Sequence, residues 1–194
     1  MTEARGGEGE VTWMTSAMLK AYSHPLRRQI LRLLARREFL RAADVAAELD
    51  VPANSVSFHL RALADAGLIR EAPERARDRR DRVWTHVKSA LNLGDPRTPV
   101  ADEQLGNAVL AAVAEDHQEL LRRALAWSSE YVTGRESEVH GTFTQQHIRL
   151  TSAEFKALME QIAHAVNAAE EAHERDDPDA RLWQIDLLAA DDQI

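Results

Sequence analysis

Cysteine is absent from the 194-residue sequence, and long apolar runs are missing as well. The first absence excludes disulfide bonds, thiolate zinc sites and cysteine nucleophiles, and it fits a cytoplasmic protein. The longest apolar run, Ala108 to Ala114, has seven residues, whereas a membrane-spanning helix needs about 20. We therefore expect no membrane contact. Residues 1–11 are polar and rich in Gly and Glu, which predicts a disordered N-terminus rather than a signal peptide.

Negative charge predominates over the whole chain, but the two halves differ in sign. The formal net charge is −8. Residues 20–90 carry 15 basic and 9 acidic side chains, a net charge of +6, whereas residues 91–194 carry 8 basic and 20 acidic ones, a net charge of −12. The first half is therefore a candidate for contact with a polyanion, which the second half would repel.

The first ninety residues have the pattern of short helices followed by a β-hairpin. Helices are expected over 13–22, 23–38, 42–50 and 54–66, and extended runs over 39–40, 68–74 and 81–87. Ser23 or His24 can cap the second helix, where Pro25 lies near the first position. Gly67 is placed to end the fourth.

Phe58 is the unusual residue of the fourth helix. Val56, Leu60 and Leu63 are spaced i, i+4, i+7 and predict a buried stripe, and Phe58 lies roughly opposite it. An exposed phenylalanine there could pack on a thymine methyl group or on deoxyribose. The alternative is that the helix is rotated and Phe58 fills a gap against the wing, the arginine-rich hairpin segment 74–82 that follows the helix.

The second half of the chain begins after a stretch rich in Pro and Gly, residues 91–100, which we interpret as a linker. One long amphipathic helix is expected over 102–131. Residues 138–150 have β character, Thr151 and Glu154 form a capping box for a further helix, and alternation over 183–187 predicts a last strand.

These patterns predict a mainly α protein with a small β component (α+β). The expected organisation is a disordered segment 1–11, a winged helix-turn-helix domain 12–90, the linker 91–100, and a C-terminal domain 101–194 for dimerisation and for sensing an effector.

The tip of the hairpin is rich in arginine. Five arginines fall within eight residues, against the two acids Asp78 and Asp81: they are Arg75, Arg77, Arg79, Arg80 and Arg82. Such a run can be a solvated loop. Directly behind a helix with a polar outer face it favours contact with the phosphates of DNA, because a helix fits the major groove and the hairpin then lies along the backbone.

Three stretches, "SHPLRRQILRLL", "AADVAAELDVPANSVSFHLRALADAGLIRE" and "RRDRVWTHV", resemble the DNA-binding domain of the ArsR-like winged helix-turn-helix bacterial transcriptional regulators. The resemblance covers roughly residues 15–88. It implies homodimers that bind operator DNA and usually repress. It also implies a reading helix over 54–66, with these side chains towards DNA: Asn54, Ser55, Ser57, Phe58, His59 and Arg61.

The sequence departs from this family in three places. Arg41 stands where the third helix usually has a capping Ser or Thr, and Asp50 where a glycine usually follows that helix, so the turn is expected to be slightly strained. The third helix also lacks the Cys-x-Cys thiolates of the metal-sensing members. Metal sensing through that site is therefore not inherited.

Other candidate sites are weaker. The histidines of the second half are not spaced as metal ligands, so we expect no metal and no cofactor. Asp116 and His117 could form a catalytic pair, but no nucleophile accompanies them, so we expect no enzyme activity. Four aromatic residues could line a small-molecule pocket, although such spacings are more often those of a core: Trp127, Tyr131, Phe143 and Trp183.

The sequence thus favours a dimeric, sequence-specific regulator that binds double-stranded operator DNA in the cytoplasm and represses transcription, with a small-molecule effector as a further partner. The alternative is a winged helix that binds another protein through the acidic second half. The arginine-rich hairpin favours DNA, because a protein-binding module has no need of a phosphate contact there.

Overall fold

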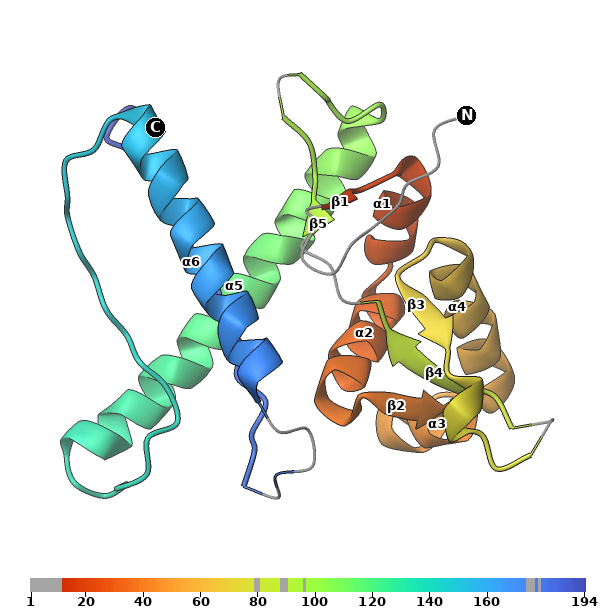
Figure 1. Ribbon diagram of the computed structural model, residues 1–194. Helices are drawn as coiled ribbons and strands as arrows, with labels where there is room; N and C mark the ends of the chain where they lie inside the picture. The colour runs from red at the N-terminus through yellow and green to blue at the C-terminus, as the bar shows by residue number, and fades with distance from the viewer. Residues whose placement is uncertain (1–11, 79–80, 88–90, 96, 174–176, 178) are drawn as a thin grey trace. The chain divides into compact units, whose positions relative to one another are not determined.

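The computed structural model describes residues 12–78, 81–87, 91–95, 97–173, 177 and 179–194. The chain divides into two compact units, Met1–Glu115 and Asp116–Ile194. Its described residues form the mainly α fold with a small sheet that the sequence predicts (Figure 1).

Four short helices make up most of the first unit. They are α1 (Ser16–Tyr22), α2 (Pro25–Arg37), α3 (Ala42–Leu49) and α4 (Ala53–Asp65). The expectation that the first helix begins at Trp13 is wrong: Thr15 is its N-cap and accepts a hydrogen bond from the Met18 N–H at 3.2 Å. His24 rather than Ser23 caps α2, because its Nδ1 accepts from the Leu26 N–H at 3.2 Å.

The two ends of α3 carry the two unusual residues noted in the sequence. Arg41 is the N-cap of α3 without a side-chain acceptor, and its backbone N–H donates to Asp44 Oδ2 at 2.9 Å. Asp50, the C-cap, has φ 52° and ψ 48°, in the left-handed region that glycine adopts most easily. Asp50 thus holds a backbone conformation in which glycine would avoid the clash of a Cβ.

A three-stranded antiparallel sheet closes the unit. β2 (Phe39–Arg41) and β3 (Ile69–Glu71) flank β4 (Val83–His86) in the order β2-β4-β3, with Leu40 and Glu71 both opposite Trp84. The predicted hairpin is therefore present. A single 3₁₀ turn, Pro73–Arg75, lies between its strands.

The core of this unit joins α2, α3 and α4 to the sheet. Its fully enclosed side chains come from every one of these elements: Ile30, Leu34, Val45, Val56, Leu60, Leu63 and Ile69. This core holds α4 by one face, which fixes the direction in which the opposite face points.

Two further strands join the beginning of the unit to residues beyond the hairpin. β1 (Thr12–Trp13) pairs in parallel with β5 (Leu91–Asn92). The segment 91–100, expected as a linker, thus contains a strand of the first unit.

Two long helices dominate the rest of the chain. α5 (Glu103–Val132) has 30 residues and runs from the first unit into the second, and α6 (Ser152–Ala172) has 21. The capping box of α6 is confirmed: Glu154 N–H donates to Thr151 Oγ1 at 3.3 Å, and Thr151 N–H donates to Glu154 Oε2 at 2.7 Å.

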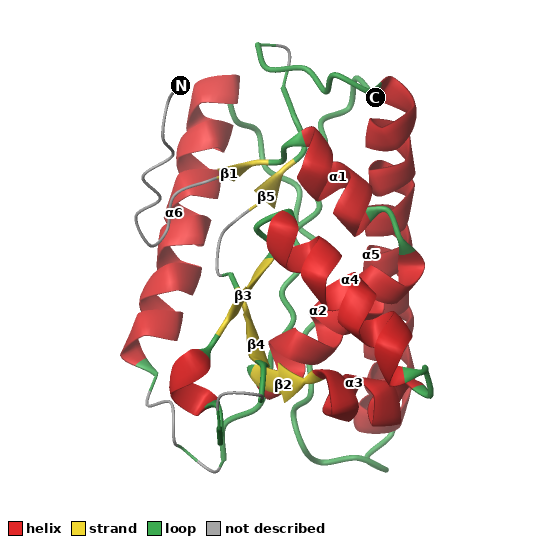
Figure 2. Ribbon diagram, turned by 90° about the vertical axis from the view of Figure 1, so that its right-hand side faces the viewer, coloured by secondary structure: helices red, strands yellow, loops and turns green. Residues whose placement is uncertain are grey.

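The strands expected over 138–150 and 183–187 are not formed. Both stretches are loop (Figure 2). They lie against α5 through side chains instead: Trp127 Nε1 donates to the Glu138 carbonyl at 3.1 Å, and Arg123 Nη2 donates to Gln184 Oε1 at 2.8 Å. Alternating residues are not enough for a strand, because a strand also needs a neighbouring backbone to pair with.

Candidate nucleic-acid interface

α4 has one enclosed face and one open face. Val56, Leu60 and Leu63 are completely buried, whereas Phe58 is 61% exposed. The helix is therefore oriented as the periodicity predicts, and the alternative in which Phe58 fills a gap against the wing is wrong. A large apolar side chain held in water on a fixed helix is available to a partner.

The polar residues beside Phe58 follow the same division. Asn54 and Arg61 are exposed, and Ser55 and Ser57 are half-buried. Ser57 Oγ donates to the Ala53 carbonyl at 2.9 Å, and Arg61 Nε donates to the Ser57 carbonyl at 3.1 Å. The Arg61 side chain thus extends towards the N-terminus of α4 and contacts the turn that carries Phe58.

His59 does not belong to the open face, contrary to the expectation that it points towards DNA. Its side chain is buried, with 9% exposure, and its ring centroid lies 4.6 Å from that of His24. Burial, helped by the charges of His24 and Arg27, lowers the pKa of His59. Successive residues of an α-helix differ by about 100° around its axis, so His59 lies on the side next to the core although Phe58 does not.

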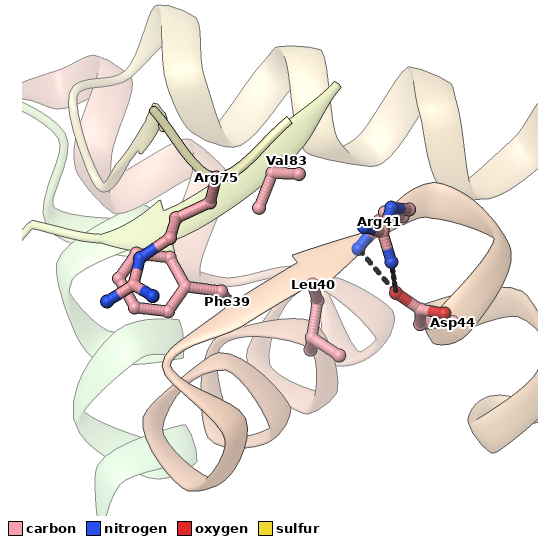
Figure 3. A pocket seen from close by; sticks show the side chains of 6 residues that line it. All are labelled: Phe39, Leu40, Arg41, Asp44, Arg75 and Val83. Atoms are coloured by element: carbon pink, nitrogen blue, oxygen red, sulfur yellow. Dashed lines mark hydrogen bonds and ion pairs between the residues drawn. The ribbon is translucent and has the colours of Figure 1, made fainter. Parts of the chain in front are cut away.

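The described arginines of the wing, the arginine-rich segment 74–82, are partly engaged within the chain. The Arg75 guanidinium lies over the Phe39 ring, 4.6 Å from its centroid (Figure 3), and Arg82 Nη1 is 3.4 Å from Glu71 Oε1. Arg77 donates its backbone N–H to Asp81 Oδ2 at 3.1 Å. The predicted contacts of Arg79 and Arg80 lie outside the described residues.

Arg41 is the residue that sequence reasoning missed as part of this interface. Its Nε lies 2.8 Å from both carboxylate oxygens of Asp81, which joins the start of α3 to the residues just before β4. This hydrogen bond lowers the pKa of Asp81. The sequence shows only that Arg41 cannot accept a capping hydrogen bond; nothing local to it indicates Asp81, forty residues away, as its partner.

A hollow of about 210 Å³ opens beside Arg41 (Figure 3). Phe39, Leu40, Asp44 and Val83 complete its lining with Arg41 and Arg75. Ligand pockets usually measure about 300–1,000 Å³. This hollow is smaller, and we assign it no ligand.

The four aromatic residues predicted to line a small-molecule pocket do not share one environment. Trp127 and Tyr131 lie with ring centroids 4.9 Å apart on α5. Phe143 is 63% exposed and Trp183 is 52% exposed. Tyr131 is 40% exposed as well, so three of the four side chains are open to solvent and only Trp127 is half-buried.

Neither a metal centre nor a membrane span is indicated by the described part of the chain. No group of three or more metal-ligating side chains gathers within residues 12–78, 81–87, 91–95, 97–173, 177 and 179–194. Of the helices described there, none combines the length and the apolar character that crossing a membrane requires.

Comparisons with known proteins bear on the first unit. Residues 22–72 match the family model described as a helix-turn-helix domain. No curated protein matches the sequence.

Several solved structures are similar to the chain at low identity. An ArsR family transcriptional regulator is 24% identical, covering 55% of this chain and 88% of its own, with a TM-score of 0.31. The antimony-specific transcriptional repressor AntR is 26% identical. The match covers 54% of this chain and 87% of AntR, with a TM-score of 0.33. The YusO protein of Bacillus subtilis is 18% identical. The match covers 82% of this chain and 83% of YusO, with a TM-score of 0.36.

The family match falls on the elements that present Phe58. Residues 22–72 include α2, α3, the turn at Asp50 and α4, and the three-stranded sheet adds the wing. The chain therefore contains a helix-turn-helix domain over residues 22–72, and a three-stranded antiparallel sheet belongs to the same unit.

Proposed function

We propose that this protein is a sequence-specific regulator of transcription that inserts α4 into the major groove of duplex DNA and acts as a repressor. The observation that carries the proposal is the open face of α4, where Phe58 is 61% exposed while Val56 on the other side is fully buried. An α-helix held in this way fits the major groove and can present its outer residues to base edges.

The proposed reading residues are those of the open face. Asn54, Ser55, Ser57, Phe58 and Arg61 are exposed or half-buried on α4 and remain in the set. His59 leaves the set because its burial removes it from the groove. Phe58 would contact a thymine methyl group or a sugar, and the polar side chains around it would reach base edges and phosphates.

The wing would lie along the DNA backbone. Its five arginines, Arg75, Arg77, Arg79, Arg80 and Arg82, belong to the basic half of the chain and would neutralise phosphates. The Arg41–Asp81 ion pair would set the wing's position relative to α4, since α3 and α4 pack on the same core.

Two copies are expected to act together in the cytoplasm. A helix-turn-helix protein usually reads a palindrome, with one recognition helix in each half-site. Repression would then follow from occupancy of an operator. The second unit, with the aromatic residues Trp127, Tyr131, Phe143 and Trp183, is the part of the chain available to respond to a small molecule.

The proposal is tested by selecting bound fragments from a random duplex pool at physiological salt, followed by binding assays on the selected site. Phe58→Ala should weaken binding to that site by about 1–3 kcal/mol, the scale of one base-pair preference, and should leave non-specific binding almost unchanged. The melting temperature should barely move, because the side chain is not part of the core.

Asp65→Ala is the matched control, since Asp65 is also exposed on α4 but lies at its far end. The control should retain the affinity of the wild-type protein. Failure of the wild-type protein to enrich any sequence would refute a reading function, and equal losses on all sequences would mean that Phe58 does not read bases.

A further inference from the structure

The ring of Phe58 lies against the ring of His59, the next residue of α4. The two ring centroids are 5.5 Å apart and the ring planes meet at 80°, an edge-to-face arrangement that aromatic pairs prefer. Phe58 is 61% exposed, whereas His59 is 9% exposed. The exposed ring therefore has a buried aromatic neighbour on one side.

His59 is held in turn by a second histidine, which belongs to another part of the unit. The ring of His24 lies 4.6 Å from that of His59, centroid to centroid, at an interplanar angle of 51°. His24 is itself fixed, because its Nδ1 accepts a hydrogen bond from the Leu26 N–H at 3.2 Å and so caps α2. His24, His59 and Phe58 thus form a row of three rings from the N-terminus of α2 to the open face of α4.

The contribution of His59 to this row is its ring rather than a hydrogen bond. Within the part of the chain that the structure describes, the buried Nδ1 of His59 has no hydrogen-bond partner. An unpaired buried nitrogen costs stability, so a leucine would serve the core at least as well. Burial lowers the pKa of His59, which keeps the ring uncharged at neutral pH. What histidine offers here, and leucine does not, is an aromatic surface that meets two other rings.

Phe58 needs such a neighbour because its helix leaves its side chain a choice of conformation. An aromatic side chain on an α-helix adopts a χ1 angle of about 180° or about −60°, and an exposed side chain exchanges between rotamers rapidly. Binding must then immobilise the side chain, which costs affinity, whereas a side chain already ordered in the bound rotamer avoids this cost. The His59 ring favours the rotamer of Phe58 that keeps the edge-to-face contact.

We propose that His59 is a positioning residue for the reading of bases: through its contacts with His24 and Phe58, it holds the Phe58 ring in the rotamer that enters the major groove. His59 does not touch DNA itself and acts only through Phe58. The inference deepens the proposed function and rests on it for the contact between Phe58 and DNA. The ordering of Phe58 in the free protein can be measured without DNA.

The first experiment measures the rotamer of Phe58 in the free, full-length protein by NMR. Three-bond scalar couplings should show one predominant χ1 rotamer in the wild type and in His59→Phe, which keeps a ring at this position. His59→Leu should show averaging between rotamers. His24→Asn retains a capping acceptor for α2 but removes the ring behind His59, and it should change the Phe58 couplings in the same direction.

Ile30→Val is the matched control for a loss of core packing. It shortens a fully buried side chain of α2 that is not part of the ring row, and it should leave the Phe58 couplings unchanged. An averaged Phe58 in the wild type would overturn the proposal. So would wild-type couplings in both His59→Leu and His24→Asn.

The second experiment is a double-mutant cycle on the DNA site selected with the wild-type protein. His59→Leu should weaken binding to that site about threefold to tenfold, because binding must then order Phe58, and should leave non-specific binding unchanged. His59→Phe should retain the affinity. In a Phe58→Ala background, His59→Leu should change the affinity by no more than about twofold, since the side chain that His59 positions is gone. Equal losses in the two backgrounds would overturn the proposal.

The two experiments separate this inference from the proposed function. A protein that enriches no DNA sequence, or that loses no affinity on Phe58→Ala, would refute the proposed function, while the NMR couplings would still decide whether His59 orders Phe58. A loss of affinity on Phe58→Ala, together with full affinity in His59→Leu, would leave the proposed function standing and overturn the positioning role of His59.

Discussion

Arg41 and Asp81, forty residues apart in the sequence, are joined by hydrogen bonds of 2.8 Å from Nε to each carboxylate oxygen. Their side chains are 29% and 17% exposed, so the pair is partly shielded from water. It connects the N-terminus of α3 with the arginine-rich wing. α4 and the wing are the two elements proposed to contact DNA. The Arg41–Asp81 ion pair fixes the wing to α3, and α3 packs with α4 in the same core.

Breaking this pair should loosen the wing without disturbing α4. Arg41→Gln and Asp81→Asn should each lower DNA affinity and increase hydrogen exchange in β4. The double variant should lose less than the sum of the two single losses, since both remove the same interaction. Strict additivity in this double-mutant cycle would show that the pair does not act as a unit.

The same pair has a defined pH dependence. The hydrogen bond from Arg41 lowers the pKa of Asp81 below its ordinary value. The ion pair therefore contributes its full stability above the ordinary pKa of an aspartate, and this contribution is lost as the pH falls through the lowered pKa of Asp81. Opening of β4, measured by hydrogen exchange of its backbone amides, should increase only in strong acid. Asp81→Asn should abolish that increase.

Removing charge from the wing should alter the salt dependence of DNA binding. Neutralising Arg79, Arg80 and Arg82 together should weaken binding to all duplex sequences and flatten the salt slope by about 0.9 for each phosphate that the wing no longer neutralises. Three glutamines in place of Arg122, Arg149 and Arg181, in the C-terminal unit, match the change in net charge and should leave the slope unaltered. An unchanged slope in the wing variant would show that the wing does not touch phosphate.

Asp50→Gly should stabilise the first unit. Asp50 adopts φ 52°, and glycine accepts this left-handed conformation without the clash that a Cβ introduces. Because glycine also increases the entropy of the unfolded chain, the expected gain in the free energy of unfolding is at most about 1 kcal/mol. Ala47→Gly, in the regular part of α3, should instead cost about 1 kcal/mol. Urea titration of both variants is the measurement, and destabilisation by Asp50→Gly would refute the argument.

Acid should destabilise the junction of α2 and α4. Burial lowers the pKa of both His24 and His59, with a further contribution from the charge of Arg27. The unfolded chain then binds more protons than the folded one, so this stability is complete above the ordinary histidine pKa and declines as the pH falls below it. Protonation of His24 at Nδ1 would also remove the acceptor that caps α2.

Urea titrations at about pH 7.5 and 5.5 bracket this range. His59→Phe should reduce the loss of stability between the two pH values, because a non-titrating ring replaces a buried imidazole. His147→Phe, at an exposed position of the C-terminal unit, should lose as much stability as the wild type. A pH dependence identical in the wild type and both variants would exclude the histidine pair as its cause.

Periodicity alone determined most of the first unit. The i, i+4, i+7 spacing of Val56, Leu60 and Leu63 predicts the buried face of α4 and the exposure of Phe58, and both are confirmed. The capping box at Thr151 and Glu154 is likewise a local pattern, and the structure forms it. These predictions succeed because a helix and its caps depend on residues within one or two turns of each other.

Only the tertiary structure decided which side chains meet across the chain. The burial of His59 depends on His24 in another helix, and the pairing of Arg41 with Asp81 depends on how β2 and β4 align, so neither follows from spacing. The alternation of Val139, Gly141 and Phe143, and that of Trp183, Ile185 and Leu187, is equally visible in the sequence. It produces no strand in the single chain, because strand formation requires the backbone of a partner that local sequence cannot supply.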